Sequence, residues 1–418
     1  MATGKSKFNS KFSFMEEWKT IHISDIGKIV TGKTPRTSIA ENYGGRIPFL
    51  TPSDDLSGKY APRSAKTLTN LGLAEVKNCL LPDHAICVSC IGSDLGKVVM
   101  TKQPTVTNQQ FNSIIPNADF DPDFVYYLMT IVGKKLNYLS KTSTAVPIVN
   151  KSSFSAFEVS VPPLHEQKRI ARILSSIDDI IALNNRINHN LEEQALALFK
   201  SWFIDFEPFK DGNFVDSELG LIPEGWQIKR AEDLCQINIG KTPPRKETQW
   251  FSLENDESVW ISISDMADCG VFIHDSAEKL TKEALKKFNI ILVPEGSVLL
   301  SFKLTIGRVA IANRELTTNE AIARFVTNDN VLALFLYLVL NKYDYSKLGS
   351  TSSIATAVNS KIVKSMPILW PGYSIISAFS DSISAAFREI KKRQEENRCL
   401  TSLRESLLPE LMSGRMIN

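Results

Sequence analysis

The chain has 418 residues, of which 43% are hydrophobic and 22% charged, and 48 lysines and arginines nearly balance 46 aspartates and glutamates. This length is enough for two or three units with separate cores, and the composition is that of a soluble globular protein rather than a disordered chain. The longest apolar run, Val331 to Leu340, is half of the ~20 residues that a membrane helix needs, and residues 1–12 lack the apolar core of a signal peptide, so we expect a cytoplasmic protein.

The first motif along the chain is Gly27 to Thr34, GKIVTGKT, which satisfies the phosphate-loop pattern G-x-x-x-x-G-K-[ST]. Such a loop needs a helix that opens at the Gly-Lys, but Pro35 disfavours helical backbone in the residue before it. The phrase GKTP also returns at residues 240–243, where Cys235 stands in place of the leading glycine. A P-loop that binds a nucleotide is therefore only an alternative to a structural or phosphate-contacting turn.

The two GKTP phrases belong to an internal repeat with an offset of about 210 residues. Further matches keep the same order in both halves: Trp18 with Trp226, residues 47–54 with 258–265, Leu81-Pro82 with Val293-Pro294, residues 91–98 with 303–309, and residues 107–109 with 318–320. Colinear matches of this extent predict a duplicated domain.

Each repeat then shows the same helix and loop. Asp121-Pro122 has the pattern of a helix N-cap followed by proline, and the apolar run from Val331 to Leu340 is its counterpart. A polar loop follows in both copies, at residues 140–150 and 346–359. Short strands bounded by Gly, Pro and Asn fill the remainder, so each half is expected to begin with an α+β domain.

A long helix is predicted after each domain, because apolar residues recur in steps of three and four. The expected seam of the first helix contains Ile170, Ile173, Ile177, Ile180, Asn184, Ile187, Leu191, Gln194 and Leu198. That of the second contains Ile376, Phe379, Ile383, Ala386, Ile390, Arg393, Asn397, Leu400 and Leu407. Chain order makes the pair antiparallel, and Asn184 opposite Arg393 or Asn397 either fixes the register or lies exposed to solvent.

These motifs together resemble one family. The GKTP turns, the phrases Pro48-Phe49-Leu50 with Asp54 and Val259-Trp260-Ile261 with Asp265, the helix opening VPPLHEQKRIARILSSIDD and the endings LALFKSWFIDFEP and LRESLLPELMSGRM resemble the specificity subunit of type I restriction-modification systems. The likeness extends over nearly the whole chain. The second helix departs from it, since Pro371-Gly372-Tyr373 is not followed by a counterpart of Glu166-Gln167.

The fold class expected from the repeat and the resemblance is α+β, with two similar target recognition domains joined by two long antiparallel helices in a coiled coil. The expected parts are domain 1 at 1–160, helix 1 at 161–206, a linker at 207–222, domain 2 at 223–370 and helix 2 at 371–414. The resemblance implies that each domain reads one half of a bipartite double-stranded DNA site, while the helices set the spacer and dock two methyltransferase subunits. It further implies S-adenosylmethionine, ATP and Mg²⁺ on partner subunits, and restriction and translocase subunits in a larger complex.

The residues themselves indicate no reaction in this chain. Cys87 and Cys90 with His84 could begin a zinc site, but they lack a second pair and fit packed thiols in a strand better. His165-Glu166 lacks the second histidine of a zinc-protease helix, and Val161-Pro162-Pro163-Leu164 lacks the amide and the aromatic residue of a methyltransferase loop. We therefore predict a non-enzymatic subunit without a metal or cofactor of its own.

Candidate DNA-binding residues are polar or basic side chains in turns that occur in both repeats. A net charge of +2 neither requires nor excludes DNA, because local basic surface governs the affinity for phosphate. Lysine, arginine and hydroxyl groups contact phosphates, and Asn or Gln can pair with adenine edges. The candidates are Lys33, Thr34, Arg36, Ser93, Lys97, Asn108, Gln109, Gln110, Lys141, Thr142, Ser143, Lys241, Thr242, Arg245, Lys303, Arg308, Ser350 and Thr351.

Two alternatives to a DNA-specificity subunit stay open at this point. One is a coiled-coil adaptor that links two protein-binding domains without nucleic acid. The other is the nucleotide-binding protein suggested by GKIVTGKT.

Overall fold

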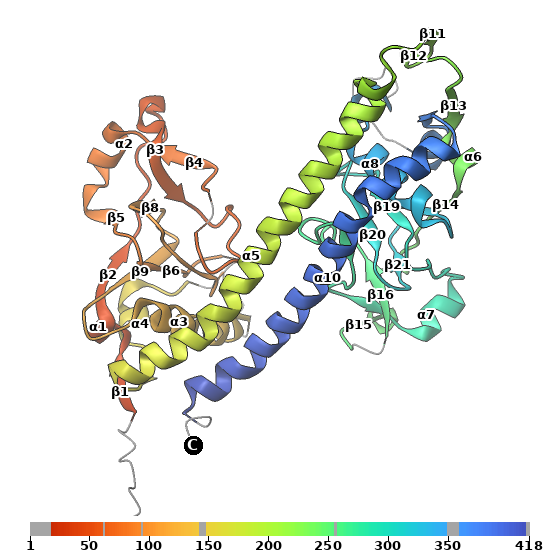
Figure 1. Ribbon diagram of the computed structural model, residues 1–418. Helices are drawn as coiled ribbons and strands as arrows, with labels where there is room; N and C mark the ends of the chain where they lie inside the picture. The colour runs from red at the N-terminus through yellow and green to blue at the C-terminus, as the bar shows by residue number, and fades with distance from the viewer. Residues whose placement is uncertain are drawn as a thin grey trace, which may run out of the picture. The chain divides into compact units, whose positions relative to one another are not determined.

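The computed structural model describes residues 18–61, 63–92, 95–141, 148–254, 257–348 and 359–414 (Figure 1). The chain forms two compact units, Met1–Ile181 with Leu400–Asn418 and Ala182–Cys399, which are called here the first and the second unit. Most of the two polar loops predicted at residues 140–150 and 346–359 lies outside the described residues.

The first unit contains two four-stranded sheets, ordered β2-β9-β6-β7 and β4-β3-β8-β5, and a separate pair β1-β10. Its strands are β1 (Lys19–His22), β2 (Gly27–Thr31), β3 (Tyr43–Leu50), β4 (Lys66–Leu68), β5 (Leu80–Leu81), β6 (Ile86–Ser89), β7 (Val98–Met100), β8 (Thr105–Thr107), β9 (Phe111–Pro116) and β10 (Glu158–Val161). Its shorter helices are α1 (Ile23–Ile26), α2 (Asn70–Glu75), α3 (Pro122–Lys141) and α4 (Lys151–Ser155), with 3₁₀ turns η1 (Ala40–Asn42) and η2 (Lys77–Cys79).

Strand β6 is buried along its whole length because it has a packed layer on each face. Successive side chains of a strand point to opposite faces, and here Ile86 and Val88 pack in the cluster that includes residues of α3. Cys87 points the other way, into a cluster with Leu50 of the second sheet. Helix α3 starts as predicted, since Asp121 Oδ1 accepts the N–H of Phe124 at 3.0 Å.

The second unit repeats this plan with sheets β14-β22-β19-β20-β17 and β15-β18-β16-β21 and a separate pair β13-β23. Its strands are β11 (Phe214–Ser217), β12 (Gly220–Pro223), β13 (Gln227–Arg230), β14 (Gln236–Ile239), β15 (Phe251–Ser252), β16 (Ser258–Ile261), β17 (Phe272–Ile273), β18 (Lys279–Leu280), β19 (Val298–Ser301), β20 (Val309–Ala312), β21 (Thr317–Thr318), β22 (Ile322–Val326) and β23 (Pro367–Trp370). Its shorter helices are α6 (Ala231–Leu234), α7 (Lys282–Lys287), α8 (Asn330–Lys342) and α9 (Ser360–Lys364), with η3 (Glu207–Phe209), η4 (Thr248–Trp250) and η5 (Tyr345–Leu348).

The internal repeat predicted from the sequence is confirmed by the strand pairing. Strand β3 pairs with β8 in parallel, and β16 pairs with β21 in parallel, at equivalent places of the two units. In the same way β9 lies between β2 and β6, and β22 lies between β14 and β19. Residues 207–222, expected as a linker, contain η3 and the antiparallel hairpin of β11 and β12.

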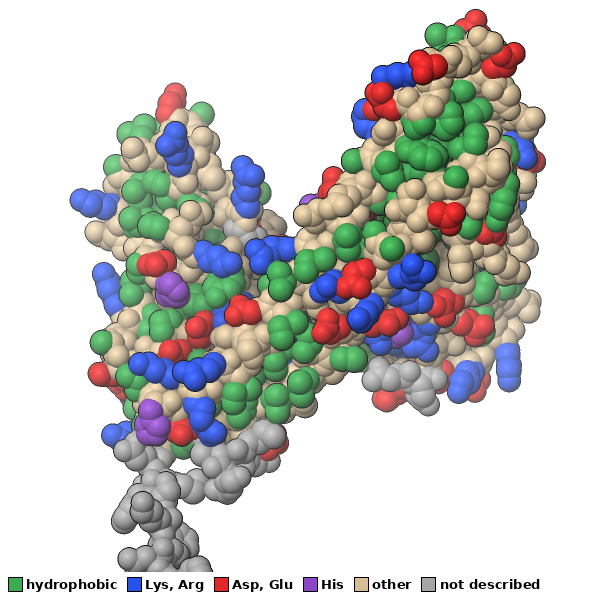
Figure 2. All heavy atoms as spheres, viewed as in Figure 1, with side chains coloured by type: hydrophobic (Ala, Val, Ile, Leu, Met, Phe, Trp, Pro, Cys, Tyr) green, Lys and Arg blue, Asp and Glu red, His purple; other side chains and the backbone are tan. Residues whose placement is uncertain are grey.

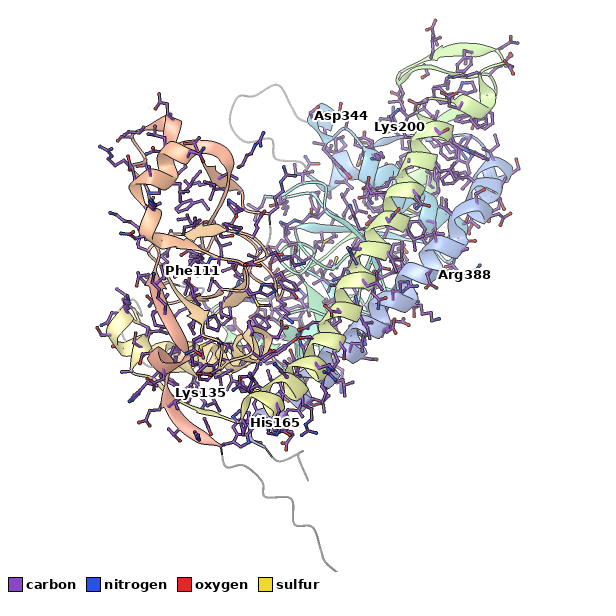
Figure 3. All side chains as sticks on the ribbon, turned by 60° about the vertical axis from the view of Figure 1, so that its left-hand side comes forward. Phe111, Lys135, His165, Lys200, Asp344 and Arg388 are labelled. Atoms are coloured by element: carbon purple, nitrogen blue, oxygen red, sulfur yellow. The ribbon has the colours of Figure 1, made fainter. Side chains whose placement is uncertain are left out.

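Two long helices, α5 (Leu164–Phe203) and α10 (Tyr373–Met412), each have 40 residues and pack together. Figure 3 shows α5 as one unbroken helix between His165 and Lys200. In the second unit Asn184 contacts Arg393, and the Phe199 and Phe379 rings lie 6.1 Å apart, so the two helices run antiparallel. No helix in the described part of the chain is long and apolar enough to cross a membrane.

The predicted seam of α5 is wrong at Ile173 and Ile180, which are 37% and 42% exposed. Leu174 is buried although it was not expected in the seam, and the seam residues Ile170 and Ile177 are buried as predicted. The reason is that α5 packs on two surfaces within the first unit: Tyr127 of α3 donates to Asp178 at 2.5 Å, and Arg404 of α10 donates to the same carboxylate at 2.6 Å. Burial therefore follows a broad 3.6-residue face rather than a narrow 3.5-residue seam.

In the second unit, four residues of the predicted α10 seam are buried as expected. Ile376, Phe379, Ile383 and Ile390 are all at most 3% exposed. The Phe387 ring occupies the position next to the predicted Ala386 and packs edge-to-face on Tyr337 of α8 at 5.7 Å.

Asn184 is buried, at 2% exposure, and its whole amide group is used between the two long helices. Its Nδ2 donates to Glu396 and to Asn397, both at 2.9 Å, and its Oδ1 accepts from Arg393 at 2.7 Å. Of the two sequence-based interpretations, a buried register-setting contact is correct and solvent exposure is wrong.

Candidate nucleic-acid interface

The first GKTP turn lies against the Thr-Asn turn of its own unit. The Gly32 N–H donates to the Phe111 carbonyl at 3.1 Å, and the Lys33 N–H donates to the Thr107 carbonyl at 2.9 Å. Residues 32–36 form no helix. A phosphate loop needs free backbone N–H groups at a helix N-terminus, so the nucleotide-binding interpretation of GKIVTGKT is wrong.

The second GKTP turn makes the same two contacts in the second unit. The Gly240 N–H donates to the Ile322 carbonyl at 3.2 Å, and the Lys241 N–H donates to the Thr318 carbonyl at 3.0 Å. We call this pairing of a GKTP turn (residues 32–35 or 240–243) with a Thr-Asn turn (residues 107–110 or 318–321) the turn frame.

Glycine is needed in both turn frames because two backbone segments approach closely. A Cβ atom on Gly32 would lie 2.1 Å from the Asn108 carbonyl oxygen, and one on Gly240 would lie 2.1 Å from the Asn319 carbonyl oxygen. The glycine of GKTP therefore serves backbone packing rather than an unusual dihedral angle.

Side chains also join the two halves of each turn frame. Thr34 Oγ1 donates to Gln109 Oε1 at 2.6 Å, and Thr242 Oγ1 donates to Glu320 in the second unit. Two predicted DNA-binding side chains of the first unit are thus held together by a hydrogen bond.

Asn108, a predicted base contact, is buried and bonds within its own turn. It is 8% exposed, its Oδ1 accepts the Gln110 N–H at 3.1 Å, and its Nδ2 donates to Gln110 Oε1 at 2.8 Å. Both ends of the amide hold the turn itself, and base contact by Asn108 stays a prediction. Gln109 lies exposed beside it.

Several predicted basic residues are held by partners within their own unit. Arg36 donates to Glu75 from Nε at 2.9 Å and from NH2 at 2.7 Å, and the guanidinium lowers the pKa of Glu75 to about 2. Lys241 donates to the Phe288 and Asn289 carbonyls at 3.2 and 3.1 Å. These cations have fixed positions rather than free side chains.

The other two arginines are fixed as well. Arg245 pairs with Glu278 at 2.9 Å, and its guanidinium lies 4.5 Å from the Phe251 ring centroid. Arg308 donates to the Ile263 carbonyl at 2.7 Å.

The predicted lysines Lys33, Lys97 and Lys303 are exposed. On the face drawn in Figure 2, lysines and arginines are interspersed with acidic side chains, as the small net charge suggests. Ser93, Thr142, Ser143, Ser350 and Thr351 and the side chain of Lys141 lie outside what the structure describes.

Asp54 and Asp265 occupy equivalent positions of the sequence repeat, and both have a structural role that the sequence did not indicate. Asp54 Oδ2 accepts the N–H and the hydroxyl of Thr51 at 2.7 and 3.0 Å, and its Oδ1 accepts the Ala65 N–H at 2.8 Å. Asp265 makes the equivalent bonds to Ser262 and Ala277. Each aspartate closes the loop that follows β3 or β16, directly beside a turn frame.

Gln167 also has a role that the sequence did not reveal. It is 3% exposed, accepts the Asp121 N–H at 3.0 Å and donates to the Pro162 carbonyl at 2.9 Å. It therefore fixes the start of α5 to the start of α3. The second repeat has no residue in its sequence that corresponds to Gln167.

The thiols at Cys87 and Cys90 are buried, and burial raises the pKa of Cys87 to about 12, which disfavours the thiolate that zinc requires. The His84 side chain is 59% exposed. Among the described residues no group of three His, Cys, Asp or Glu side chains could hold a metal ion. The packed-thiol interpretation fits this arrangement.

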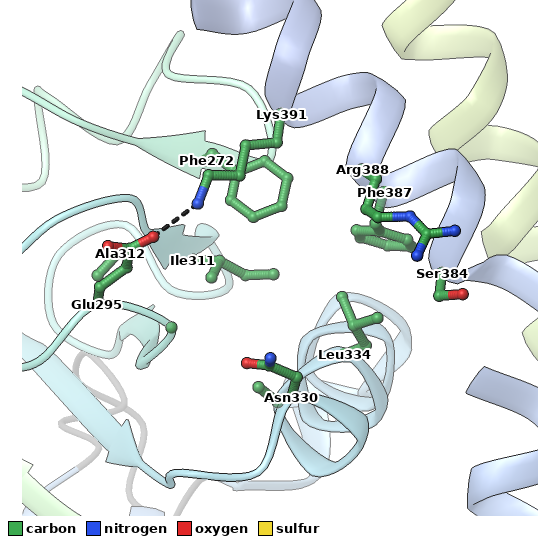
Figure 4. A pocket seen from close by; sticks show the side chains of 12 residues that line it. Phe272, Glu295, Ile311, Ala312, Asn330, Leu334, Ser384, Phe387, Arg388 and Lys391 are labelled. Atoms are coloured by element: carbon green, nitrogen blue, oxygen red, sulfur yellow. Dashed lines mark hydrogen bonds and ion pairs between the residues drawn. The ribbon is translucent and has the colours of Figure 1, made fainter. Parts of the chain in front are cut away.

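A cavity of about 510 Å³ opens in the second unit between α8, α10 and the sheet (Figure 4). Phe272, Ile311, Leu334 and Phe387 supply apolar walls, and Lys391 donates to Glu295 at 2.6 Å across one side. None of the predicted DNA-binding residues lines this cavity, so it lies apart from the turn frames.

Comparison with known proteins identifies the family. The model of the type I restriction modification DNA specificity domain matches twice, at residues 15–193 and 223–396. The chain is 30% identical to the type I restriction enzyme MjaIX specificity subunit of Methanocaldococcus jannaschii, over 96% of this chain and 94% of that protein. It is 25% identical to the HindI specificity subunit of Haemophilus influenzae, over 96% and 100%.

A solved structure has the same fold. The crystal structure of the type I restriction-modification system S subunit from M. genitalium matches 98% of this chain and 99% of its own, with a TM-score of 0.53 and 14% sequence identity. The two matches of one domain model coincide with the two repeats built around the turn frames. The chain therefore belongs to the type I restriction-modification DNA specificity family, as a non-catalytic specificity subunit.

Proposed function

We propose that each unit reads one half of a bipartite site in double-stranded DNA, and that α5 and α10 set the number of unspecified base pairs between the halves. One observation carries the proposal: the turn frame makes equivalent backbone bonds in both units, but the exposed side chain that bonds the GKTP threonine differs. Exposed Gln109 of the first unit corresponds to exposed Glu320 of the second. Gln suits an adenine edge and Glu suits a cytosine amino group, so one scaffold would serve two different half-sites.

Exchange of the first domain tests the two-reader model. Residues 1–160 are replaced by the same region of a relative with another specificity, and methylated adenines are mapped across a genome that also carries the partner genes. We expect one half of the methylated site to change and the other half to stay. A change in both halves together would contradict the model.

Binding to DNA itself is tested on the assembled complex by salt titration. If Lys33, Lys97 and Lys303 contact phosphates, the logarithm of the binding constant falls linearly with the logarithm of salt concentration, with a slope of about −0.9 per phosphate contact. The absence of any salt-sensitive binding to duplex DNA would favour the coiled-coil adaptor instead.

The partners in this proposal are two methyltransferase subunits, which bring S-adenosylmethionine, and in a larger complex restriction and translocase subunits with ATP and Mg²⁺. Exposed apolar residues on α5 support a docking role for the long helices. Ile173 and Ile180 are seven residues apart on one side of α5 and are 37% and 42% exposed. Apolar side chains in such a stripe are typical of a surface that a partner covers.

The docking role predicts the effect of charge on that stripe. Changing both Ile173 and Ile180 to aspartate should abolish co-purification with the methyltransferase, because the partner would have to desolvate two carboxylates. Leu71→Asp in α2, where Leu71 is 55% exposed, is the matched control and should leave co-purification unchanged. Retained binding by the double variant would exclude this stripe as the docking surface.

A further inference from the structure

The loop from Ser301 to Arg308 in the second unit contains a leucine with left-handed backbone and an exposed side chain. Leu304 has a φ of +60° and is 97% exposed. A single exposed leucine is ordinary, but a leucine with left-handed backbone is uncommon, because its Cβ approaches the following carbonyl. Leu304 combines unfavourable backbone with full exposure of an apolar side chain.

The surrounding hydrogen bonds impose this conformation. Ser301 Oγ donates to the Thr305 carbonyl at 2.7 Å and accepts the Arg308 N–H at 3.0 Å. The Gly307 N–H donates to the Ser301 carbonyl at 3.0 Å. The loop is therefore a built turn that presents Leu304 at its tip.

The corresponding loop of the first unit is one residue longer, because the Gly96 N–H donates to the Ser89 carbonyl where the Gly307 N–H donates to the Ser301 carbonyl. The Cys90 N–H donates to the Gln110 carbonyl at 2.7 Å, and the Phe302 N–H donates to the Ala321 carbonyl at 3.0 Å, which aligns the two loops at their first residues. Two residues further on, Leu304 corresponds to Gly92, whose φ is +91°. Glycine adopts this backbone freely.

A strained residue that the sequence could replace by glycine points to a role for its side chain. The loop is joined to the second turn frame through the bond from Phe302 to Ala321, and exposed Lys303 precedes the tip. In the first unit Gln110 lies beside Gly92, since a Cβ on that glycine would be 3.7 Å from Gln110 Nε2. The tip therefore adjoins the surface that carries the candidate base-reading side chains.

We propose that Leu304 is an apolar wedge that enters the DNA half-site read by the second unit and separates two neighbouring base pairs, while Lys303 contacts the adjacent phosphate. Leucine is among the side chains that proteins insert at base steps, where they partly unstack the bases. The inference depends on the proposed function.

The test uses the complete complex with its methyltransferase partner and a duplex with the mapped site, in which 2-aminopurine replaces single bases of the second half-site in turn. The wild-type complex should raise the fluorescence at one step. Leu304→Gly should abolish that rise and weaken binding to the site about tenfold, with an unchanged or higher melting temperature because strain is removed. Leu304→Met, which keeps a long apolar side chain, should retain the signal.

Leu253→Gly is the matched control, because Leu253 is 78% exposed in the same unit and has no left-handed backbone. It should bind and fluoresce like the wild type. The wedge is overturned if Leu304→Gly keeps both affinity and fluorescence while the wild-type complex binds DNA, a result that leaves the proposed function intact. If the wild-type complex binds no duplex, both the wedge and the proposed function are overturned. If the Leu304→Gly variant loses the methyltransferase subunit, Leu304 contacts a protein partner and the wedge is overturned.

Discussion

Asn184 is a polar residue in the interface between α5 and α10, and its hydrogen bonds fix how the helices pair. A shift of either helix would leave its amide and the groups of Arg393, Glu396 and Asn397 without these bonds. Buried donors and acceptors without partners are costly, so the correct pairing is favoured over neighbouring ones. The sequence could indicate this role because the polar residue interrupts an apolar pattern opposite other polar positions.

Removal of this amide should destabilise the protein measurably. Asn184→Ala is expected to lower the free energy of unfolding by about 1–3 kcal/mol, because buried partners lose their bonds. Asn190→Ala is the control in the same helix, because the exposed Asn190 side chain bonds only to Gln194 among the described residues. It should change the free energy of unfolding by less than about 0.5 kcal/mol. Chemical denaturation compares the two, and equal losses would exclude a special role for Asn184.

At the scale of elements, the turn frame depends on the absence of a side chain at Gly32 and Gly240. Gly32→Ala should cost about 2–4 kcal/mol, since a Cβ at 2.1 Å from a backbone oxygen forces the strand ends apart. Gly58→Ala is the control, because its nearest atom would be the Tyr60 oxygen at 3.9 Å, and it should be nearly neutral. Thermal unfolding of both variants gives the comparison, and two similar melting temperatures would contradict the packing argument.

The elements themselves were largely predictable, whereas their contacts were not. Capping at Asp121, the repeated strands and both long helices follow from local patterns, and the structure confirms them. The exposure of Ile173 depends on how α5 packs against segments distant in sequence, which no local pattern encodes. Gln109 stays a predicted base contact, because its exposure leaves that role open to the DNA-binding test.

At the scale of the whole molecule, the proposed spacer role of α5 and α10 is tested by lengthening both helices by the same amount. The two units divide after Ile181 in α5 and after Cys399 in α10, which are the places for a matched insertion. One heptad at each place should add about 10 Å of helix, equal to about three base pairs of B-DNA, to the unspecified part of the methylated site.

A heptad in α5 alone is the control for that experiment. It would displace the contact between Asp178 and Arg404 relative to those of Asn184, so the complex should lose DNA methylation. Genome-wide mapping of methylated adenines reads out both variants. An unchanged spacer after the double insertion would argue against the proposed role of α5 and α10.

The first unit is completed by the last turns of α10, since Leu408, Leu411 and Met412 pack in the same core as Phe124 and Leu174. A ribosome makes those three residues only after the whole second unit, Ala182–Cys399. At about 5–20 residues per second the amino-terminal half must wait roughly ten seconds or longer, with apolar surface uncovered, while the intervening half is synthesised and folds. Newly made subunits should therefore depend on chaperones during translation, and messages truncated before codon 400 should yield proteins whose second unit is native and whose first unit is degraded.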